Sequence, residues 1–273
     1  MSLAGKTVFI TGGSRGIGRA IALRAAQDGA NIVIAAKSDA PHPKLPGTIH
    51  TVAAEIEAAG GQALPLKLDV RDDDAVGAAI ERAAKHFGGI DAVVNNAGAI
   101  NLRPASDLPL KRFDLMHQVN VRAMLSVTKA ALPWLRKAKA PAHVLSLSPP
   151  LNLRPNWLGP HIPYTVTKYS MTLMSLGLAE ELRTNGISVN TLWPRTTIAT
   201  AAVEFEVGAE LMANSRAPAI MADAAHAILT ADNLTGQTLL DEEILRAQGA
   251  SDFSGYAQIA GKKDLQLDIY VDT

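Results

Sequence analysis

The stretch Thr11-Gly12-Gly13-Ser14-Arg15-Gly16-Ile17-Gly18 joins an apolar, β-branched run at residues 7–11 to an alanine-rich run at residues 17–28. In a strand–turn–helix unit, one glycine permits a tight turn, one lets a pyrophosphate approach the backbone, and one lets helix and strand pack closely. The helix N-terminus adds N–H groups and partial positive charge for phosphates. Since any tight turn can use glycine, this interpretation depends on the rest of the chain. The candidate dinucleotide contacts are Gly12, Ser14, Arg15, Gly16, Ile17 and Gly18.

The rest of the chain alternates short apolar runs with alanine-rich helical runs. Strands are expected at residues 7–11, 31–35, 63–68, 92–95, 143–147, 188–192 and 238–240. Helices are expected at residues 17–28, 51–59, 73–87, 111–137, 164–184 and 219–231. This alternation predicts an α/β fold of the Rossmann type, a doubly wound, mostly parallel sheet of seven strands with helices on both faces.

The sequence indicates one domain rather than two. We expect residues 1–245 to form a single dinucleotide-binding and catalytic domain, because ligands of a doubly wound sheet bind beyond the C-terminal ends of its strands. Residues 246–273 have weak periodicity. They are expected to form a tail that packs on the domain or on a partner subunit.

Composition and charge exclude several classes of protein. The 273 residues hold 26 Lys and Arg against 26 Asp and Glu, so no basic field attracts nucleic acid or an anionic membrane. The absence of cysteine excludes disulfides and thiolate metal sites, and the seven histidines do not cluster at ligand spacing. We find neither a signal-peptide pattern nor an apolar run of membrane-span length. We therefore expect a soluble, cytoplasmic protein with no metal site and no membrane span.

The end of the second strand indicates which dinucleotide is bound. An NAD site usually has an acid about 20 residues past the glycines, where it binds the ribose 2′-hydroxyl. Here the strand ends Ala35-Ala36-Lys37-Ser38, and no carboxylate occurs until Asp39. Lys37 and Arg15 could both reach a 2′-phosphate, which favours NADP(H) over NAD(H). The alternative is that Lys37 is a solvated loop cation and Asp39 turns back to the ribose.

Further motifs follow the glycine turn in a characteristic order. They are Asp69-Val70, Asn95-Asn96-Ala97-Gly98, Asn120 and Tyr164-x-x-x-Lys168. In this order and spacing the chain resembles the single-domain short-chain dehydrogenase/reductase family over roughly residues 4–245. The segments at 43–47, 148–153 and 192–194 look like the hydroxysteroid dehydrogenase-like protein 2 branch of that family. Some members of the branch carry an additional lipid-binding domain, which we do not expect within these 273 residues.

The resemblance implies roles for these motifs. Asp69 and Val70 would contact the adenine ring, and Asn96, Ala97 and Gly98 would line the ribose side of the cofactor. Pro194 and Ile198 would contact the nicotinamide, and Thr200 would lie near the pyrophosphate. Asn120 would hold a water that links Lys168 to solvent. Simpler roles stay open: Asp69 could cap the helix that begins near Asp73, and the asparagines could only stabilise a turn.

Tyr164 and Lys168 are the candidate chemical centre. They are four residues apart on a predicted helix, so their side chains share a face. Reduction of a ketone needs a proton donor and oxidation of an alcohol needs a base, but a phenol has a pKa of about 10. Lowering that pKa by ~3 units takes roughly 4 kcal/mol. An ammonium about 4 Å away supplies about 4 kcal/mol at an effective dielectric of about 20, so Lys168 suffices. In the family this lysine also binds the nicotinamide ribose.

The loop after the fifth strand departs from the family pattern. The family usually has a serine about 13 residues before the tyrosine, where it holds the substrate oxygen. Here Leu151 stands 13 residues before Tyr164, and Pro149 aligns with the serine when the strand is aligned. Ser148 is then the candidate substrate-orienting hydroxyl, unless it only satisfies backbone groups at the strand end. His161 is an alternative donor, or a plain loop histidine.

These patterns predict an NADP(H)-dependent oxidoreductase that transfers hydride between nicotinamide and a carbonyl or secondary alcohol. Apolar side chains in residues 200–217 form either a lid over the nicotinamide or one side of a packed helix; they are Val203, Phe205, Val207, Leu211 and Met212. A lid would suit a mostly apolar, lipid-like or steroid-like substrate. Arg195 stands where relatives have glycine, and it either binds an acidic substrate group or points into solvent.

Two further expectations concern function and assembly. The alternative function is a low-turnover NADP(H)-binding sensor or scaffold with the same fold, which the departure at Pro149 motivates. By resemblance we expect a homodimer or homotetramer that assembles through long helices around residues 114–135 and 171–182.

Overall fold

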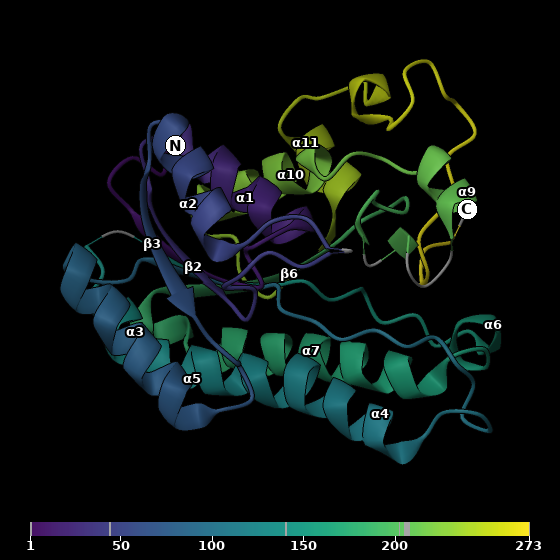
Figure 1. The fold of residues 1–273 in the computed structure, drawn as a ribbon, viewed down its shortest axis with the longest axis horizontal. Helices are drawn as coiled ribbons and strands as arrows, with labels where there is room; N and C mark the ends of the chain where they lie inside the picture. The colour runs from purple at the N-terminus through teal and green to yellow at the C-terminus, as the bar shows by residue number, and fades with distance from the viewer. Residues whose placement is uncertain (1, 44, 140, 202, 205–207, 273) are drawn as a thin grey trace.

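The structure, a computed structural model, describes residues 2–43, 45–139, 141–201, 203–204 and 208–272. Its centre is a seven-stranded sheet in the order β3-β2-β1-β4-β5-β6-β7, and every adjacent pair of strands is parallel. The order runs outward from β1 in one direction and from β4 in the other, and helices cover both faces (Figure 1). The predicted doubly wound α/β fold is confirmed.

Most of the strands are buried on both faces. Their bounds are Thr7–Thr11 (β1), Asn31–Ala36 (β2), Gln62–Lys67 (β3), Ala92–Asn95 (β4), Ala142–Ser146 (β5), Ile187–Trp193 (β6) and Thr238–Leu240 (β7). Side chains such as Val8, Ile32 and Val93 have no exposed surface. Continuous runs of this kind form parallel strands because both sides of the pleat are covered by apolar groups. The predicted strands agree with these bounds to within one residue at each end.

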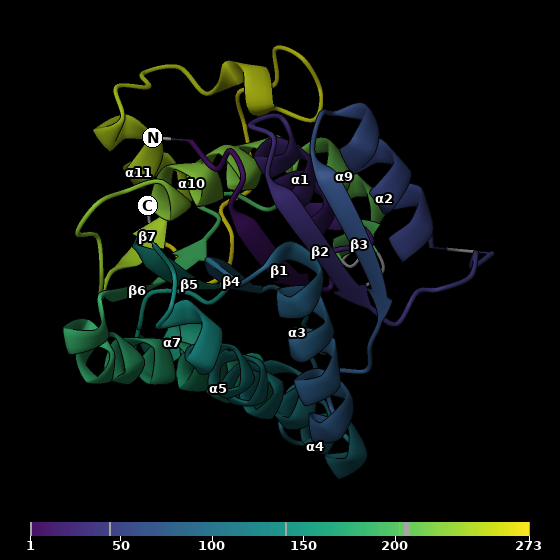
Figure 2. The ribbon, with the colours of Figure 1, turned by 90° about the vertical axis from the view of Figure 1, so that its left-hand side faces the viewer.

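Two layers of helices enclose the sheet (Figure 2). One layer consists of α1 (Gly16–Ala26), α2 (Ile49–Ala58), α10 (Ala219–Leu229) and α11 (Asp241–Ala247). The other consists of α3 (Asp73–Phe87), α4 (Leu110–Met116), α5 (Ala123–Leu135) and α7 (Ile162–Glu181). Each layer packs on its side of the sheet through a separate apolar core. The shorter helices α6 (Pro155–Leu158) and α9 (Ala209–Ala213) lie toward the right-hand end of Figure 1.

The helix that we expected at residues 111–137 is interrupted. A π-helical stretch, His117–Arg122, separates α4 from α5. A π-helical turn closes hydrogen bonds from i to i+5, which a 3.6-residue apolar period does not predict, and such turns are frequent at functional sites. Asn120 lies in this stretch and is fully buried.

The last residues run back across the molecule from α11. A short 3₁₀ turn, Ser254–Tyr256, is followed by an extended path that we call the C-terminal segment, residues 257–272. It joins the loop after β6 through two backbone hydrogen bonds, from Thr197 N to Gln266 O (2.9 Å) and from Asp268 N to Arg195 O (3.0 Å). The segment therefore lies beside the loop after β6, at the C-terminal ends of the strands.

Candidate active site

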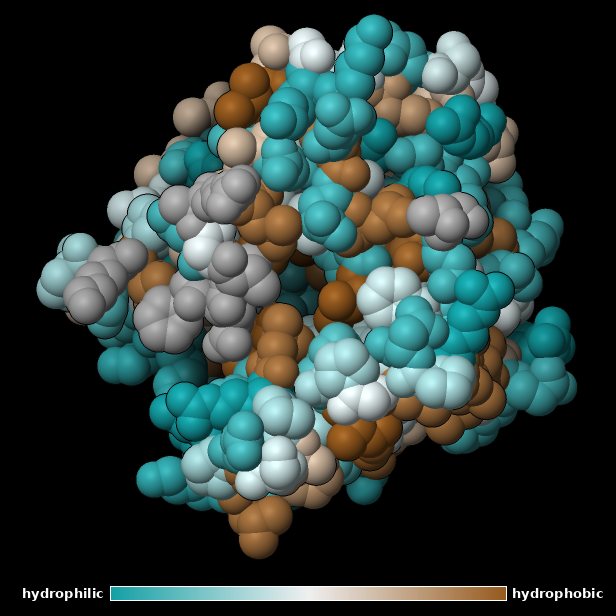
Figure 3. Space-filling view, turned by 90° about the vertical axis from the view of Figure 1, so that its right-hand side faces the viewer, coloured by the Kyte–Doolittle hydropathy of each residue, from teal (hydrophilic) through white to brown (hydrophobic). Residues whose placement is uncertain are grey.

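A cavity of about 900 Å³ opens at the C-terminal ends of the strands, where the strand order reverses between β1 and β4. Its walls come from the glycine turn, the ends of β2 to β6, the start of α7 and the C-terminal segment. Figure 3 shows a hollow in this face with hydrophobic side chains around it. A doubly wound sheet binds ligands at this point, and ligand sites typically measure ~300–1,000 Å³.

Most of the predicted site residues meet around this cavity. Those that line it are Gly12, Ser14, Arg15, Gly16, Ile17, Lys37, Asp69, Val70, Asn96, Ala97, Gly98, Tyr164, Lys168, Pro194, Ile198 and Thr200. Within the described part of the chain, Gly18, Asn120 and Ser148 are not among the lining residues.

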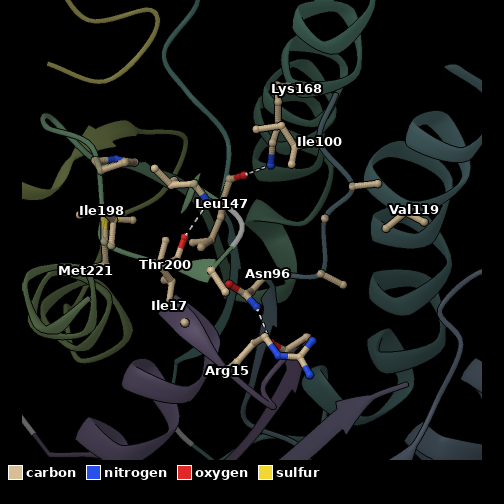
Figure 4. Close-up of a pocket in the computed structure, with 18 of the residues that line it drawn as sticks. Arg15, Ile17, Asn96, Ile100, Val119, Leu147, Lys168, Ile198, Thr200 and Met221 are labelled. Atoms are coloured by element: carbon tan, nitrogen blue, oxygen red, sulfur yellow. Dashed lines mark hydrogen bonds between the residues drawn. The ribbon is translucent and has the colours of Figure 1, made fainter. Parts of the chain in front are cut away.

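The glycine turn is shaped by the side-chain amide of Asn96. Its Nδ2 donates to the carbonyl oxygens of Thr11 (2.8 Å) and Gly12 (3.0 Å). A Cβ atom on Gly18 would lie 2.4 Å from this nitrogen, and one on Gly12 would lie 2.9 Å from it. Gly12 also has a φ of +67°, a conformation that favours glycine. Asn96, which lies beside Arg15 in Figure 4, therefore holds the backbone of the turn. Gly18 is not among the described lining residues, and it serves the packing of the turn against Asn96.

Cations gather where the ends of β2 and β3 reach the cavity. Arg15 donates from Nη2 to Ser38 Oγ at 2.7 Å. Lys37 Nζ lies 3.2 Å from Asp69 Oδ2, and 65% of the Lys37 side chain is exposed. Hydrogen bonds from Arg71 hold the pKa of Asp69 well below its usual value, and Lys37 adds to this effect. Asp69 is therefore a carboxylate balanced by two cations.

The geometry decides two alternatives for nearby acids. Asp39 pairs with His50 (2.8 Å) and Lys67 (3.3 Å), and it is not one of the described residues that line the cavity. The N-cap of α3 is Asp72, whose side chain accepts a hydrogen bond from the first turn of the helix at 3.0 Å. The suggestions that Asp39 turns back to the ribose and that Asp69 caps α3 are therefore not supported.

Tyr164 and Lys168 lie on the first two turns of α7 and both reach the cavity, although only 5% and 6% of their surface is exposed. Lys168 Nζ donates to Leu147 O at 2.8 Å (Figure 4) and lies 5.3 Å from the centroid of the Trp193 ring. Burial lowers the pKa of Lys168 to about 8, while the charge of Asp268 acts to raise it. The pair thus consists of a phenol beside a buried, partly compensated ammonium.

Asn120 and Ser148 lie behind the cavity wall. Asn120 accepts from Ala99 N (2.7 Å) and donates to Ala99 O (2.9 Å) and Thr167 Oγ1 (3.0 Å), which joins the loop after β4 to α7. Ser148 is fully buried, and its hydroxyl lies 3.0 Å from Thr172 Oγ1 on α7. The chain after β5 therefore turns so that the Ser148 hydroxyl contacts α7 and does not line the cavity.

His161 and Arg195 also point away from the reacting end. The His161 ring packs against Tyr270, with a centroid separation of 5.7 Å. The Arg195 side chain approaches Glu242 at 3.9 Å. Neither His161 nor Arg195 is among the described residues that line the cavity. The structure therefore supports neither a donor role for His161 nor binding of an acidic substrate by Arg195.

The expected lid is described only in part. Val203 and Leu211 line the cavity, and Met212 does not. Phe205 and Val207 lie outside the described residues.

Several lining residues had no predicted role. Trp193 lies within the motif at residues 192–194, but nothing in the sequence indicated that its ring would lie near Lys168. Residues 266–269 form a wall of the cavity, although they are about 100 residues from Lys168 along the chain. Their sequence has no periodicity that would have identified them.

Two features are not found among the described residues. No group of three or more His, Asp or Glu side chains there is arranged to hold a metal ion. No helix in the same part of the chain has the length and apolar composition needed to cross a membrane.

Comparisons with known proteins agree with this geometry. A model of the short chain dehydrogenase family matches residues 6–208. Hydroxysteroid dehydrogenase-like protein 2 of Danio rerio is 54% identical over 271 residues, which are 99% of this chain and 65% of that protein. The Homo sapiens protein of the same name is 52% identical over 99% of this chain and 64% of its own length. The chain thus spans just under two thirds of the length of these curated relatives.

Two solved structures extend the comparison. A short chain dehydrogenase from Mycobacterium thermoresistibile is 54% identical, with a TM-score of 0.94 over 100% of this chain and 97% of that one. A short chain dehydrogenase from Burkholderia cenocepacia J2315, in complex with NADP, is 29% identical, with a TM-score of 0.76 over 88% of this chain and 97% of that one.

Proposed function

The chain belongs to the short chain dehydrogenase family, and from this premise we propose that it is an NADP(H)-dependent oxidoreductase. It transfers hydride between the nicotinamide and a carbonyl or secondary alcohol of a mostly apolar substrate. The observation that carries the proposal is the position of Tyr164 and Lys168 in the wall of the cavity that begins at the glycine turn. By resemblance we also propose a homodimer or homotetramer.

The cavity fits a dinucleotide. At Gly12 a Cβ atom would meet the Asn96 amide and the Ala97 backbone, so glycine there lets the turn pack closely against the loop after β4. Gly12, Ser14 and Gly16 of the turn line the cavity. The N–H groups of the first turn of α1 suit a pyrophosphate. Val70 would hold the adenine ring, and Ile198 the nicotinamide carboxamide. When bound, NADP(H) supplies or accepts the hydride.

The cations at the end of β2 support NADP(H) as the cofactor. Arg15 and Lys37 line the cavity beside Ser38, which offers two charged groups and a hydroxyl to a 2′-phosphate. The first acid after β2, Asp39, is engaged outside the cavity with His50 and Lys67. An acid that would repel a 2′-phosphate is thus directed elsewhere.

The proposed proton chemistry belongs to Tyr164. Its hydroxyl donates a proton to the substrate oxygen during reduction and accepts one during oxidation. The Lys168 ammonium favours the phenolate, and the Leu147 carbonyl holds that ammonium in place. Asn120 keeps the loop after β4 attached to α7, so the two sides of the site stay in register.

The walls around Tyr164 support an apolar substrate. Ile100 and Leu102 come from the loop after β4, and Leu267 and Ile269 come from the C-terminal segment. Burying apolar surface against such walls stabilises binding in proportion to the area removed from water. A strongly charged substrate would have few partners on these apolar walls.

The test is turnover of a panel of carbonyls and alcohols with NADPH and NADH. Tyr164→Phe should lower kcat/KM by ~100-fold or more, because it removes the proton donor, while the Kd for NADPH changes little. Tyr256→Phe is the matched control, since its hydroxyl bonds Asp223 at 2.7 Å and Tyr256 is not among the described lining residues. Full activity of Tyr164→Phe would refute the mechanism. Tight NADPH binding without turnover across the panel would favour the sensor, which no present observation favours.

A further inference from the structure

The C-terminal segment brings a carboxyl group to the reacting end of the cavity. Asp268 lines the cavity together with Tyr164, Lys168 and Trp193. Its backbone N–H donates to Arg195 O (3.0 Å), and Arg195 N in turn donates to Asp241 Oδ1 (2.9 Å). The loop after β6 therefore fixes the backbone on which Asp268 stands.

The residues after Asp268 are anchored as firmly. Trp193 Nε1 donates to Ile269 O at 3.1 Å. Tyr270 is buried with a φ of +72°, a strained conformation for a tyrosine that persists only where its surroundings impose it. Asp272 accepts from Trp157 Nε1 (3.0 Å) and Asn152 Nδ2 (2.9 Å). The position of Asp268 is thus determined from both sides.

The charges around Asp268 come from three parts of the chain. Lys168 faces it from α7, Asp241 from the start of α11, and Tyr270 from its own segment. Burial raises the pKa of Asp268 to about 7; Asp241 adds to this, and Lys168 opposes it. On the other side, burial lowers the pKa of Lys168, and Asp268 is the charged group that opposes that change. Each group therefore favours the ionised form of the other.

We propose that Asp268 is a positioning residue for the chemistry at Tyr164, whose carboxylate keeps Lys168 protonated. The proposal rests on the proposed function, because Tyr164 depends on the charge of Lys168 to exchange its proton. Asp268 is an acidic residue of the cavity that belongs to neither the glycine turn nor the Tyr-x-x-x-Lys motif. Asp268 lies outside residues 6–208, the part of the chain that the family model matches.

The sign of the effect follows from the charges. An ionised Asp268 raises the pKa of Lys168, so Asp268→Asn removes a charge that opposes the effect of burial, and the ammonium loses its proton at lower pH. The titration midpoint of Lys168 should fall by ~0.5 pH unit or more. The alkaline limb of kcat/KM for alcohol oxidation should move to lower pH in the same variant.

The primary measurement is NMR titration of the intact protein labelled in lysine, with the Lys168 signal assigned by Lys168→Arg. Because this titration needs no turnover, it separates the two proposals. A lowered midpoint with no activity on any substrate would refute the proposed function and leave the electrostatic effect of Asp268 on Lys168 intact. An unchanged midpoint in Asp268→Asn would refute that effect.

Two variants separate charge from structure. Asp268→Glu keeps the carboxylate and should return the midpoint toward the wild-type value; it also provides the readout if Asp268→Asn does not fold. Asp272→Asn makes the same chemical change four residues later and weakens the anchor to Trp157 and Asn152. It should lower Tm and leave the Lys168 midpoint in place. An equal shift in Asp272→Asn would mean that docking of the segment, not the charge of Asp268, governs Lys168, and the proposal would fail.

Discussion

The proposed preference for NADP(H) depends on Lys37 at the residue scale. Its ammonium lies at the cavity from the end of β2 and makes a mostly exposed ion pair with Asp69. A 2′-phosphate beside it would gain a charge-assisted hydrogen bond, whereas a carboxylate at this position would repel the phosphate and favour a ribose hydroxyl.

Lys37→Asp should therefore shift preference from NADPH toward NADH. Loss of one hydrogen bond to a charged group, about 1.5–3 kcal/mol, corresponds to a change of roughly 10–100-fold in the ratio of the kcat/KM values for the two cofactors. Lys67→Asp is the matched control, since Lys67 pairs with Asp39 away from the cavity. The same ratio in Lys37→Asp as in the wild type would contradict the assignment.

Apart from Tyr164 and Lys168 on α7, many of the site residues that the sequence indicates share one property. The glycine turn, Asp69 and the Asn96 turn each follow a strand directly, and parallel strands end at the same edge of the sheet. Ser148 also follows a strand, but the local register of the loop turns its hydroxyl toward Thr172, which a sequence does not display. Trp193 and Asp268 depend on contacts between distant segments, and no local pattern encodes those.

At the scale of elements, strands were predicted better than helices. Strand positions follow from continuous β-branched runs, whereas the π-helical stretch at His117–Arg122 has an apolar pattern that an ordinary helix also has. The short helices α6 and α11 had no predicted counterpart, whereas α9 lies within residues 200–217, for which a packed helix was one of the two alternatives.

Asp28, just after the end of α1, joins three parts of the chain. Asp28 accepts from Leu3 N (2.8 Å) and Arg24 Nη1 (3.1 Å), and it shares a hydrogen bond with His226 Nε2 on α10 (2.8 Å). Although burial raises the pKa of Asp28, hydrogen bonds from His226, Leu3 N and Arg24 hold it well below its usual value. One carboxylate thus connects the N-terminal residues, α1 and α10.

Asp28→Asn should lower the free energy of unfolding by about 1–3 kcal/mol at pH 7. A depressed folded-state pKa stabilises the protein above the unfolded value of about 3.9, and this contribution is lost as pH falls toward the folded value. When urea unfolding is measured from pH 7 to about pH 3, the difference in free energy of unfolding between the variant and the wild type should become smaller below about pH 4. Asp107→Asn, at an exposed turn, should leave stability nearly unchanged. A gap that stays constant with pH would show that the charge of Asp28 is not responsible.

At the scale of the whole molecule, apolar side chains protrude from two long helices. Leu125 on α5 and Val166 and Leu173 on α7 are 46%, 40% and 57% exposed. The two helices lie side by side in the layer that covers one face of the sheet (Figures 1 and 2). Covering these side chains with a second copy would remove apolar surface from water, which fits the assembly expected by resemblance.

Light scattering at micromolar concentration should therefore give a dimer or tetramer. Leu173→Glu, which places a charge in that face, should shift the population toward monomers. Leu153→Glu is the control, because Leu153 is 71% exposed but lies in the loop after β5. A wild-type monomer, or equal dissociation in both variants, would contradict assembly through α5 and α7.

The C-terminal segment gives the cavity walls from two distant parts of the chain. The residues proposed to bind the nucleotide lie within residues 6–208, whereas part of the wall proposed to bind the substrate is formed by residues 266–269. Chimaeras that exchange only those last few positions between relatives should consequently alter which alcohol or ketone is accepted and leave the choice of hydride carrier untouched. Substrate selectivity can therefore diverge between relatives while cofactor selectivity stays the same.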